Sequence, residues 1–176
     1  GEAVFSEGDP GKGLFIVPRY MRAAFLVGAA QGSGVLIVRN GQANTWSEPI
    51  FYNVVSASFG LQAGGDVSEM VLIVRTEKAL KEFYSNDFKL GANIGIAAGP
   101  VGAGMSAQGI TADIVSYAKT QGVFAGVALE GAHISIANSS NNAYYGRSIT
   151  PIDIIKQEVS NHQTTTLRTA AENLLK

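Results

Sequence analysis

The sequence predicts an α+β fold: a strongly curved, mainly antiparallel sheet or partly closed barrel, accompanied by several short helices. Apolar runs without polar alternation, such as the two copies of VLIVR at Val35–Arg39 and Val71–Arg75, are typical of strands covered on both faces. Glycines interrupt other apolar runs, above all GVFAGVALEGA at Gly122–Ala132, and a glycine inside a strand marks a bend or a close approach of two backbones. We therefore expect strands with such bends or approaches at four glycines: Gly28, Gly60, Gly95 and Gly126.

A hairpin signal follows the first VLIVR run. Asn40-Gly41 favours a type I′ turn, which predicts an antiparallel pair between that strand and the segment leading to Trp46. A further strand is expected at Phe124–Glu130, and the glycine-rich stretch Gly99–Gly109 predicts a mobile loop.

Three helices are predicted from caps and from the spacing of apolar residues. Thr76 precedes EKALKEFY, whose apolar residues fall on one helix face. The residues TPID at Thr150–Asp153 supply an N-cap, a first-turn proline and an acid at N3, so a helix is expected from Pro151 to about Val159. The tail Thr166–Lys176 has the apolar spacing of an amphipathic helix, which we expect to dock onto the sheet.

Composition indicates one folded domain over residues 1–176 and excludes several functions. Charged residues are only 15% of the chain and hydrophobic residues are 46%. The net charge of −1 argues against bulk binding of nucleic acid, and the absence of cysteine excludes disulfides and thiolate metal sites. No apolar run approaches the ~18 residues of a transmembrane helix. The first residues lack a signal-peptide pattern, and we expect that a targeting segment has been removed.

Catalytic motifs are not apparent. GPVGAG at Gly99–Gly104 has the wrong spacing for a dinucleotide loop, and no GK[ST] motif occurs. His133 and His162 lie far apart in the sequence, and neither has the spacing of a metal site. Ser135 and Asp113 complete a formal Ser/His/Asp set with His133, but no GxSxG motif accompanies it. We therefore expect neither an enzyme nor a bound cofactor.

One long stretch carries positive charge without acidic residues. No Asp or Glu occurs between Pro10 and Ser47, where cations and aromatic residues are interleaved. Each cation near an anionic leaflet contributes about 1 kcal/mol, so four cations predict weak, reversible attachment. The alternative is ordinary solvated arginines around a strand, with Trp46 buried in the core. The candidate lipid-binding residues are Lys12, Arg19, Tyr20, Arg22, Arg39 and Trp46.

Five stretches, in this order, resemble the SYLF domain family, which occurs in bacterial envelope proteins, yeast cortical actin-patch proteins and plant phosphoinositide-binding proteins. They are Leu14–Gly41, Trp46–Tyr52 (WSEPIFY), Ser58–Asp66 (SFGLQAGGD), Gly122–Ala132 and Asn141–Gly146 (NNAYYG). The resemblance spans about residues 12–146 and is followed by the helices expected at 150–176. It implies a lipid-binding module whose partners are anionic phospholipids or phosphoinositides. The alternative that it implies is an actin-binding or other protein-interaction module.

The residues before this region differ from eukaryotic members of the family. Those members have a basic amphipathic segment ahead of a VFP-like motif, which corresponds here to IVP at Ile16–Pro18. This chain has a short acidic leader with Glu2, Glu7 and Asp9 instead. The resemblance therefore points to a bacterial-type member, peripheral to the cell envelope on its periplasmic or outer-membrane side. Its ligands are then expected to be the anionic phospholipids of the envelope.

Overall fold

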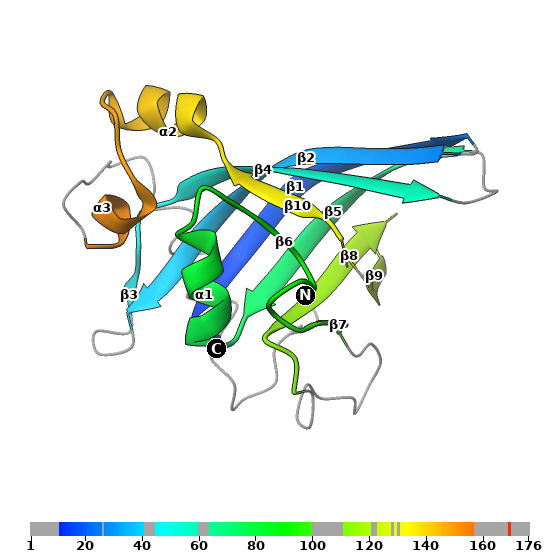
Figure 1. The fold of residues 1–176 in the computed structure, drawn as a ribbon, viewed down its shortest axis with the longest axis horizontal. Helices are drawn as coiled ribbons and strands as arrows, with labels where there is room; N and C mark the ends of the chain where they lie inside the picture. Colours follow the sequence, from blue (N-terminus) through cyan, green and yellow to red (C-terminus); the bar gives the residue numbers. More distant parts are fainter. Residues whose placement is uncertain are drawn as a thin grey trace.

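Ten strands form one sheet in the computed structural model, which describes residues 11–25, 27–40, 45–59, 64–99, 111–120, 123–127, 129, 131–156 and 169 (Figure 1). The strands are β1 (Gly13–Phe25), β2 (Val27–Asn40), β3 (Thr45–Trp46), β4 (Ile50–Phe59), β5 (Gly64–Val74), β6 (Asp87–Lys89), β7 (Ile96–Ala98), β8 (Ile114–Thr120), β9 (Val123–Gly126) and β10 (His133–Ile136). The helices are α1 (Glu77–Phe83), α2 (Asn138–Tyr145) and α3 (Pro151–Ile155).

The sheet is strongly curved and open. Its order is β6-β10-β4-β2-β1-β5-β8-β7, with β3 beside β2 and β9 beside β8. Among the described strands, the β7–β8 pair is parallel and the other pairs are antiparallel. The end strands β6 and β7 do not pair with each other within the described residues, so the sheet does not close into a barrel. The predicted α+β class with a curved, mainly antiparallel sheet is confirmed.

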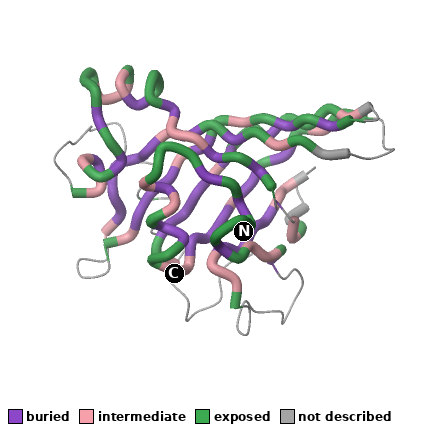
Figure 2. The backbone as a smooth tube through the Cα atoms, in the orientation of Figure 1, coloured by how far each residue is buried: buried purple, intermediate pink, exposed green. Residues whose placement is uncertain are grey.

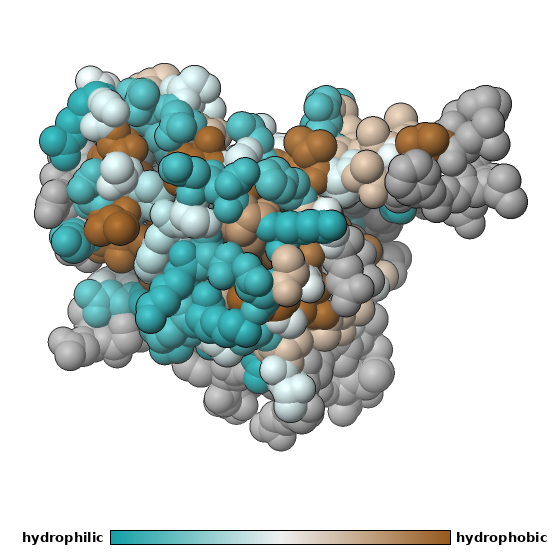
Figure 3. All heavy atoms as spheres, in the orientation of Figure 1, coloured by the Kyte–Doolittle hydropathy of each residue, from teal (hydrophilic) through white to brown (hydrophobic). Residues whose placement is uncertain are grey.

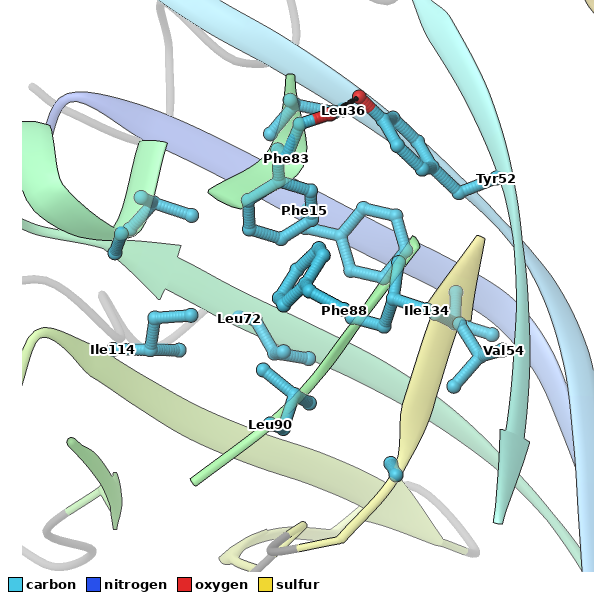
Figure 4. Packing of buried hydrophobic residues seen from close by; sticks show 14 of the residues in the cluster. Phe15, Leu36, Tyr52, Val54, Leu72, Phe83, Phe88, Leu90, Ile114 and Ile134 are labelled. Atoms are coloured by element: carbon cyan, nitrogen blue, oxygen red, sulfur yellow. Dashed lines mark hydrogen bonds between the residues drawn. The ribbon is translucent and has the colours of Figure 1, made fainter. Parts of the chain in front are cut away.

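The main core lies on the face of the sheet that α1 covers. Phe15 from β1, Tyr52 from β4 and Phe83 from α1 form an aromatic cluster with ring centroids 5.3–5.8 Å apart (Figure 4). The Tyr52 hydroxyl donates a 2.6 Å hydrogen bond to the Phe83 carbonyl, and burial raises the pKa of Tyr52. The Thr76 side chain caps α1 by accepting from the Ala79 N–H, as the sequence predicted.

A second apolar cluster lies on the opposite face of the same strands. It joins Trp46 of β3 to Leu14, Ile37, Ile73, Val115 and Tyr117. Residues 36–38 and 72–74, the middle of both VLIVR runs, are buried throughout. Both strands are therefore covered on both faces here, as their continuous apolar sequence predicted.

A β-bulge at Pro18 divides β1 into two parts. Ile16 pairs with Val35 and Arg19 pairs with Ser33, so β1 advances by three residues while β2 advances by two. The register against β5 shifts in the same place. Proline has no N–H for a ladder, and a bulge is where a central strand tolerates it.

Beyond the bulge, four strands continue past the core as a sheet extension. We define this extension as residues 19–25 of β1, 27–33 of β2, 53–59 of β4 and 64–69 of β5. Figure 2 shows alternating burial along it, and β2 alternates between exposed and less exposed residues from Val27 to Ser33. One face of the extension thus faces the core side and the other faces solvent.

The hairpin after β2 differs from the predicted turn. β2 and β3 pair antiparallel, as expected, but Asn40 faces Thr45 and still belongs to the ladder. The connection therefore consists of residues 41–44 rather than a two-residue turn at Asn40-Gly41. In this ladder Arg39 faces Trp46, and the Trp46 indole packs in the second apolar cluster.

The NNAYYG stretch forms most of α2, and its side chains hydrogen-bond to the backbone of the WSEPIFY stretch. The Asn141 side chain accepts from the Phe51 N–H and donates to the Phe51 carbonyl, both at 2.9 Å. The Tyr145 hydroxyl donates to the Pro49 carbonyl at 2.5 Å, and α2 ends at Gly146 with a φ of 68°. Asn141 thus supplies the hydrogen bonds that a neighbouring strand would otherwise make to β4.

The third predicted helix and the predicted glycine positions agree with the structure only in part. α3 starts at Pro151 with the predicted capping box, but it ends at Ile155 with Lys156 as its C-cap and so stops short of the predicted Val159. Gly60, residues 100–109 of the predicted loop and all of the predicted tail helix except Thr169 lie outside the described residues. Gly28 lies in β2, and Gly126 ends β9 against the carbonyl of Gly99, which leaves no room for a Cβ. Gly95 precedes β7 and is not in a strand, because its N–H donates to the Asp113 carboxylate instead of a ladder.

We predict that Gly34→Val lowers the free energy of unfolding by about 1–3 kcal/mol, because a Cβ there overlaps the buried Phe15 ring and overpacks the core. Chemical denaturation measures this change. Gly95→Ala is the matched control, since its Cβ meets neighbours at 3.6–3.8 Å, an ordinary contact. Equal stability of the two variants contradicts the packing described here.

Candidate functional site

The structure separates the six predicted lipid-binding residues by burial. Trp46 is 3% exposed and Tyr20 is 6% exposed, with the Tyr20 hydroxyl 2.7 Å from Ser56 Oγ. Arg39 is half-buried beside Trp46, whereas Lys12, Arg19 and Arg22 are exposed. The two aromatic rings therefore belong to the interior, in agreement with the alternative in which Trp46 is part of the core.

Two of the cations are paired with carboxylates from distant segments. Lys12 Nζ lies 3.0 Å from Glu77 Oε1 of α1. Arg22 makes two hydrogen bonds to the Asp66 carboxylate of β5, at 3.0 and 3.2 Å, and this bonding raises the pKa of Arg22. The stretch without acidic residues in the sequence therefore has acidic neighbours in space.

The four cations do not lie together on one face. Arg19 and Arg22 are three residues apart beyond the bulge, so strand alternation places them on opposite faces of β1. Lys12 precedes Arg22 by ten residues, which is about 30 Å of extended strand. This separation exceeds the Debye length of about 10 Å at 0.1 M salt. The cations therefore lie in two separate regions: Lys12 and Arg39 at one end of the strands, and Arg19 and Arg22 beyond the bulge. Whether they contact lipid stays a prediction.

The solvent-facing side of the extension, which we call the outer face, carries an exposed apolar row. Met21 faces Val67 of β5 on one side and Gln31 of β2 on the other, and Gln31 faces Val55 of β4. Met21 is 39% exposed, Val55 52% and Val67 53%. Directly facing residues share a side of the sheet, so this row crosses all four strands, with apolar side chains on β1, β4 and β5 and the polar Gln31 on β2.

The next rows of the outer face are small and apolar. Ala23 faces Ala29 and Gly65, and Ala29 faces Ala57, and all four residues are exposed. Val27 follows with 56% exposure. Hydrophobic atoms are visible along the extension in Figure 3. Soluble monomers seldom leave large contiguous apolar patches in water, and such patches mark binding surfaces.

A cation borders this apolar surface. Arg19 lies two residues from Met21 on the same face, next to the polar residues Ser33 and Asn53 of the same row. No carboxylate among the described residues contacts Arg19, since nearby Glu69 pairs with Lys119 at 3.8 Å. The outer face therefore combines apolar side chains with a border that carries Arg19 and the Glu69–Lys119 pair, a net positive charge.

The sequence reasoning missed the exposed apolar residues of this face: Met21, Val27, Val55 and Val67. Period-2 spacing with a neighbouring alanine is visible for Met21, Val27 and Val55, but it does not say which strands lie side by side. Only the register places the four residues on one surface.

The formal catalytic set does not assemble. Asp113 accepts hydrogen bonds from the Gly95 N–H at 2.7 Å and from the Thr76 hydroxyl at 2.8 Å, and these bonds lower the pKa of Asp113. His133 instead lies 3.0 Å from Asp87, and both side chains are exposed. In the described part of the chain, no three His, Cys, Asp or Glu side chains gather as metal ligands. None of the described helices has the length and apolar character of a bilayer span.

Comparison with known proteins finds a matching family model and several similar chains. Residues 55–174 match the family model Ysc84, described as Las17-binding protein actin regulator. In Saccharomyces cerevisiae, the chain is 35% identical over 146 residues to LAS seventeen-binding protein 3 and 33% identical over 155 residues to Protein YSC84. It is 32% identical over 148 residues to the human SH3 domain-containing YSC84-like protein 1. These alignments cover 79%, 84% and 82% of this chain but only 31%, 32% and 43% of the three relatives.

We predict that Trp46→Ala lowers the free energy of unfolding by about 3–5 kcal/mol, because the indole fills the second apolar cluster. Denaturant titration of the variant and the parent chain gives this difference. A variant with full stability and impaired binding to lipid vesicles would show that Trp46 acts at the surface rather than in the core.

Proposed function

The chain belongs to the Ysc84/SYLF family, and we propose that it is a non-catalytic module that attaches reversibly to anionic phospholipid or phosphoinositide headgroups at a membrane surface. The family match and the names of the relatives describe binding and actin regulation, not catalysis. The proposal concerns this chain alone, which spans less than half the length of the relatives compared.

The observation that carries the proposal is the outer face of the extension. Its apolar row projects beyond the core, and Arg19 lies at its border without a carboxylate partner among the described residues. An apolar surface bordered by a cation suits the boundary between headgroups and acyl chains, where the arginine meets phosphate and the apolar side chains leave water.

Magnitudes indicate which contact dominates. One arginine near an anionic leaflet contributes about 1 kcal/mol. The four apolar side chains of the outer face are each roughly half exposed. Burying the exposed half of one such side chain in the membrane contributes about 1 kcal/mol to the binding free energy. The apolar contribution is therefore the larger, and binding is expected to retain part of its strength when salt screens the charge.

The other predicted residues have different roles in this proposal. Tyr20 and Trp46 support the sheet from its interior. Arg22, on the opposite face, orders the extension by bridging β1 to β5 through Asp66. Lys12 and Arg39 lie at the far end of the strands, so salt screens most of their attraction to a membrane that contacts the outer face. The cell-envelope location expected from the acidic leader stays a prediction that the eukaryotic relatives do not address.

A second candidate function is a protein-interaction module of the actin-regulatory kind. The family match favours it, because the yeast relative at 35% identity is named as a Las17-binding protein. The outer face then contacts a protein partner instead of lipid. The two candidates differ in their dependence on vesicles.

We predict that the chain co-sediments with anionic vesicles more strongly than with neutral ones. Replacing both Met21 and Val67 by Asp should weaken the affinity at least about tenfold, since it removes two apolar contacts and adds two repelled charges. Arg19→Glu should weaken it less and remove most of the preference for anionic vesicles. Arg19→Glu changes an exposed side chain, so its melting temperature should hardly change. Two carboxylates at positions 21 and 67 face each other and lower the melting temperature, so a thermal melt checks that this variant is folded at the temperature of the binding assay.

The matched controls lie away from the extension. Ile152→Asp changes an apolar residue of α3 that is 47% exposed, and Lys81→Glu reverses an exposed cation of α1. Both controls should bind vesicles like the parent chain. Undiminished binding by the Met21/Val67 variant rejects the outer face as the contact, and absence of binding to any vesicle favours the protein-partner candidate.

A further inference from the structure

Within the part of the chain that the structure describes, the extension has a free backbone edge along β4. β10 pairs with β4 from Tyr52 to Val55 and ends there. The next residues of β4, Ser56–Phe59, pair with β2 on one side and with no described strand on the other. Backbone N–H and C=O groups at such an edge are a template for another strand.

The end of β10 keeps this edge open. Just before His133, the chain turns at Gly131, whose φ of 84° departs from strand geometry. The Gly131 N–H donates to the Leu90 carbonyl, and the Leu90 N–H donates to the Ala132 carbonyl, both at 2.8 Å. These bonds place both Gly131 and Ala132 opposite Leu90, and the described ladder between β10 and β4 ends at His133.

The free part of β4 lacks the features that protect edge strands. Residues 53–59, NVVSASF, contain no charged residue and no proline. The opposite edge of the extension is different, because the residues of β5 before its ladder with β8, 64–68, include the charged Asp66, which pairs with Arg22 of β1. Charged side chains at an edge disfavour the addition of another strand, and the free part of β4 has none.

We propose that the free edge of β4 pairs antiparallel with the same edge of a second copy, about a two-fold axis near Ala57. Two-fold pairing needs a surface that complements itself, and the uncharged sequence Ser56-Ala57-Ser58 does so without repulsion. The pairing makes one continuous sheet of both extensions and joins their outer faces. Val27, Val55 and the alanines of the two copies then form a single larger apolar surface.

The contact is small. An edge of four residues on each copy stays well below the roughly 1,200 Å² of a stable interface, so the dimer is weak and concentration-dependent. It is independent of what the outer face binds. A lipid surface that concentrates the chains would nevertheless favour it.

Analytical ultracentrifugation from micromolar to millimolar concentration tests this pairing. We expect a monomer–dimer equilibrium for the parent chain and an association constant at least tenfold lower for Ala57→Lys, which places two lysines near the axis. The matched control is Ala23→Lys, the same change on the same exposed face but on β1, two strands from the edge. It should dimerise like the parent chain. A monomer at every concentration overturns the proposal, and equal weakening by both variants shows contact through the outer face instead of the edge.

Cross-linking provides a second readout that does not depend on a charged variant. The chain has no cysteine, so Ala57→Cys and Ala23→Cys each introduce a single thiol. In the proposed dimer, the two thiols at position 57 lie within reach of a short bifunctional maleimide, whereas the two at position 23 are separated by five strand spacings, about 24 Å. We expect a cross-linked dimer for Ala57→Cys alone. Equal cross-linking of both variants, or of neither, contradicts edge pairing.

Discussion

The β-bulge at Pro18 determines which side chains of the central strand face the core. Before it, Phe15 and Val17 point into the main core; after it, Tyr20 does, three residues on instead of two. Without the extra residue, strand alternation would turn Arg19 toward the core and Tyr20 toward solvent. Both neighbours of β1 shift register at this point, so the bulge sets the phase of the whole extension.

This phase produces a sheet with two different environments along the same strands. Near α1, both faces are covered, by the aromatic cluster on one side and by the Trp46 cluster on the other. Past the bulge, the core-side face continues with Tyr20 and Ala30, while Met21 and the alanines of the outer face remain in water. The core holds one half of each strand in place, and the outer face of the other half is exposed to solvent. Such a division suits a binding module, because a surface built on strands that a core holds in place keeps its geometry without itself being part of the core.

Local signals predicted much of the fold but not the arrangement of the candidate site. The Thr76 and Thr150 caps act over three residues, and both were predicted from sequence and confirmed. The faces of β1 depend on pairing with β2 and β5, which no single segment encodes. For the same reason the stretch without acidic residues does not form one positive patch in space, because Glu77 and Asp66, from other elements, pair with its Lys12 and Arg22. The resemblance identified NNAYYG, but only the structure shows that Asn141 replaces a strand partner for Phe51.

An environment-sensitive fluorophore on the outer face tests the central claim most directly. The chain has no cysteine, so Met21→Cys and Ile152→Cys each take one label, on the outer face and on α3. On addition of anionic vesicles, the account predicts a blue-shifted, brighter emission from the label at position 21 and no change at position 152. An equal response at the two positions, or a response at position 152 alone, would contradict the assignment of the outer face as the membrane contact.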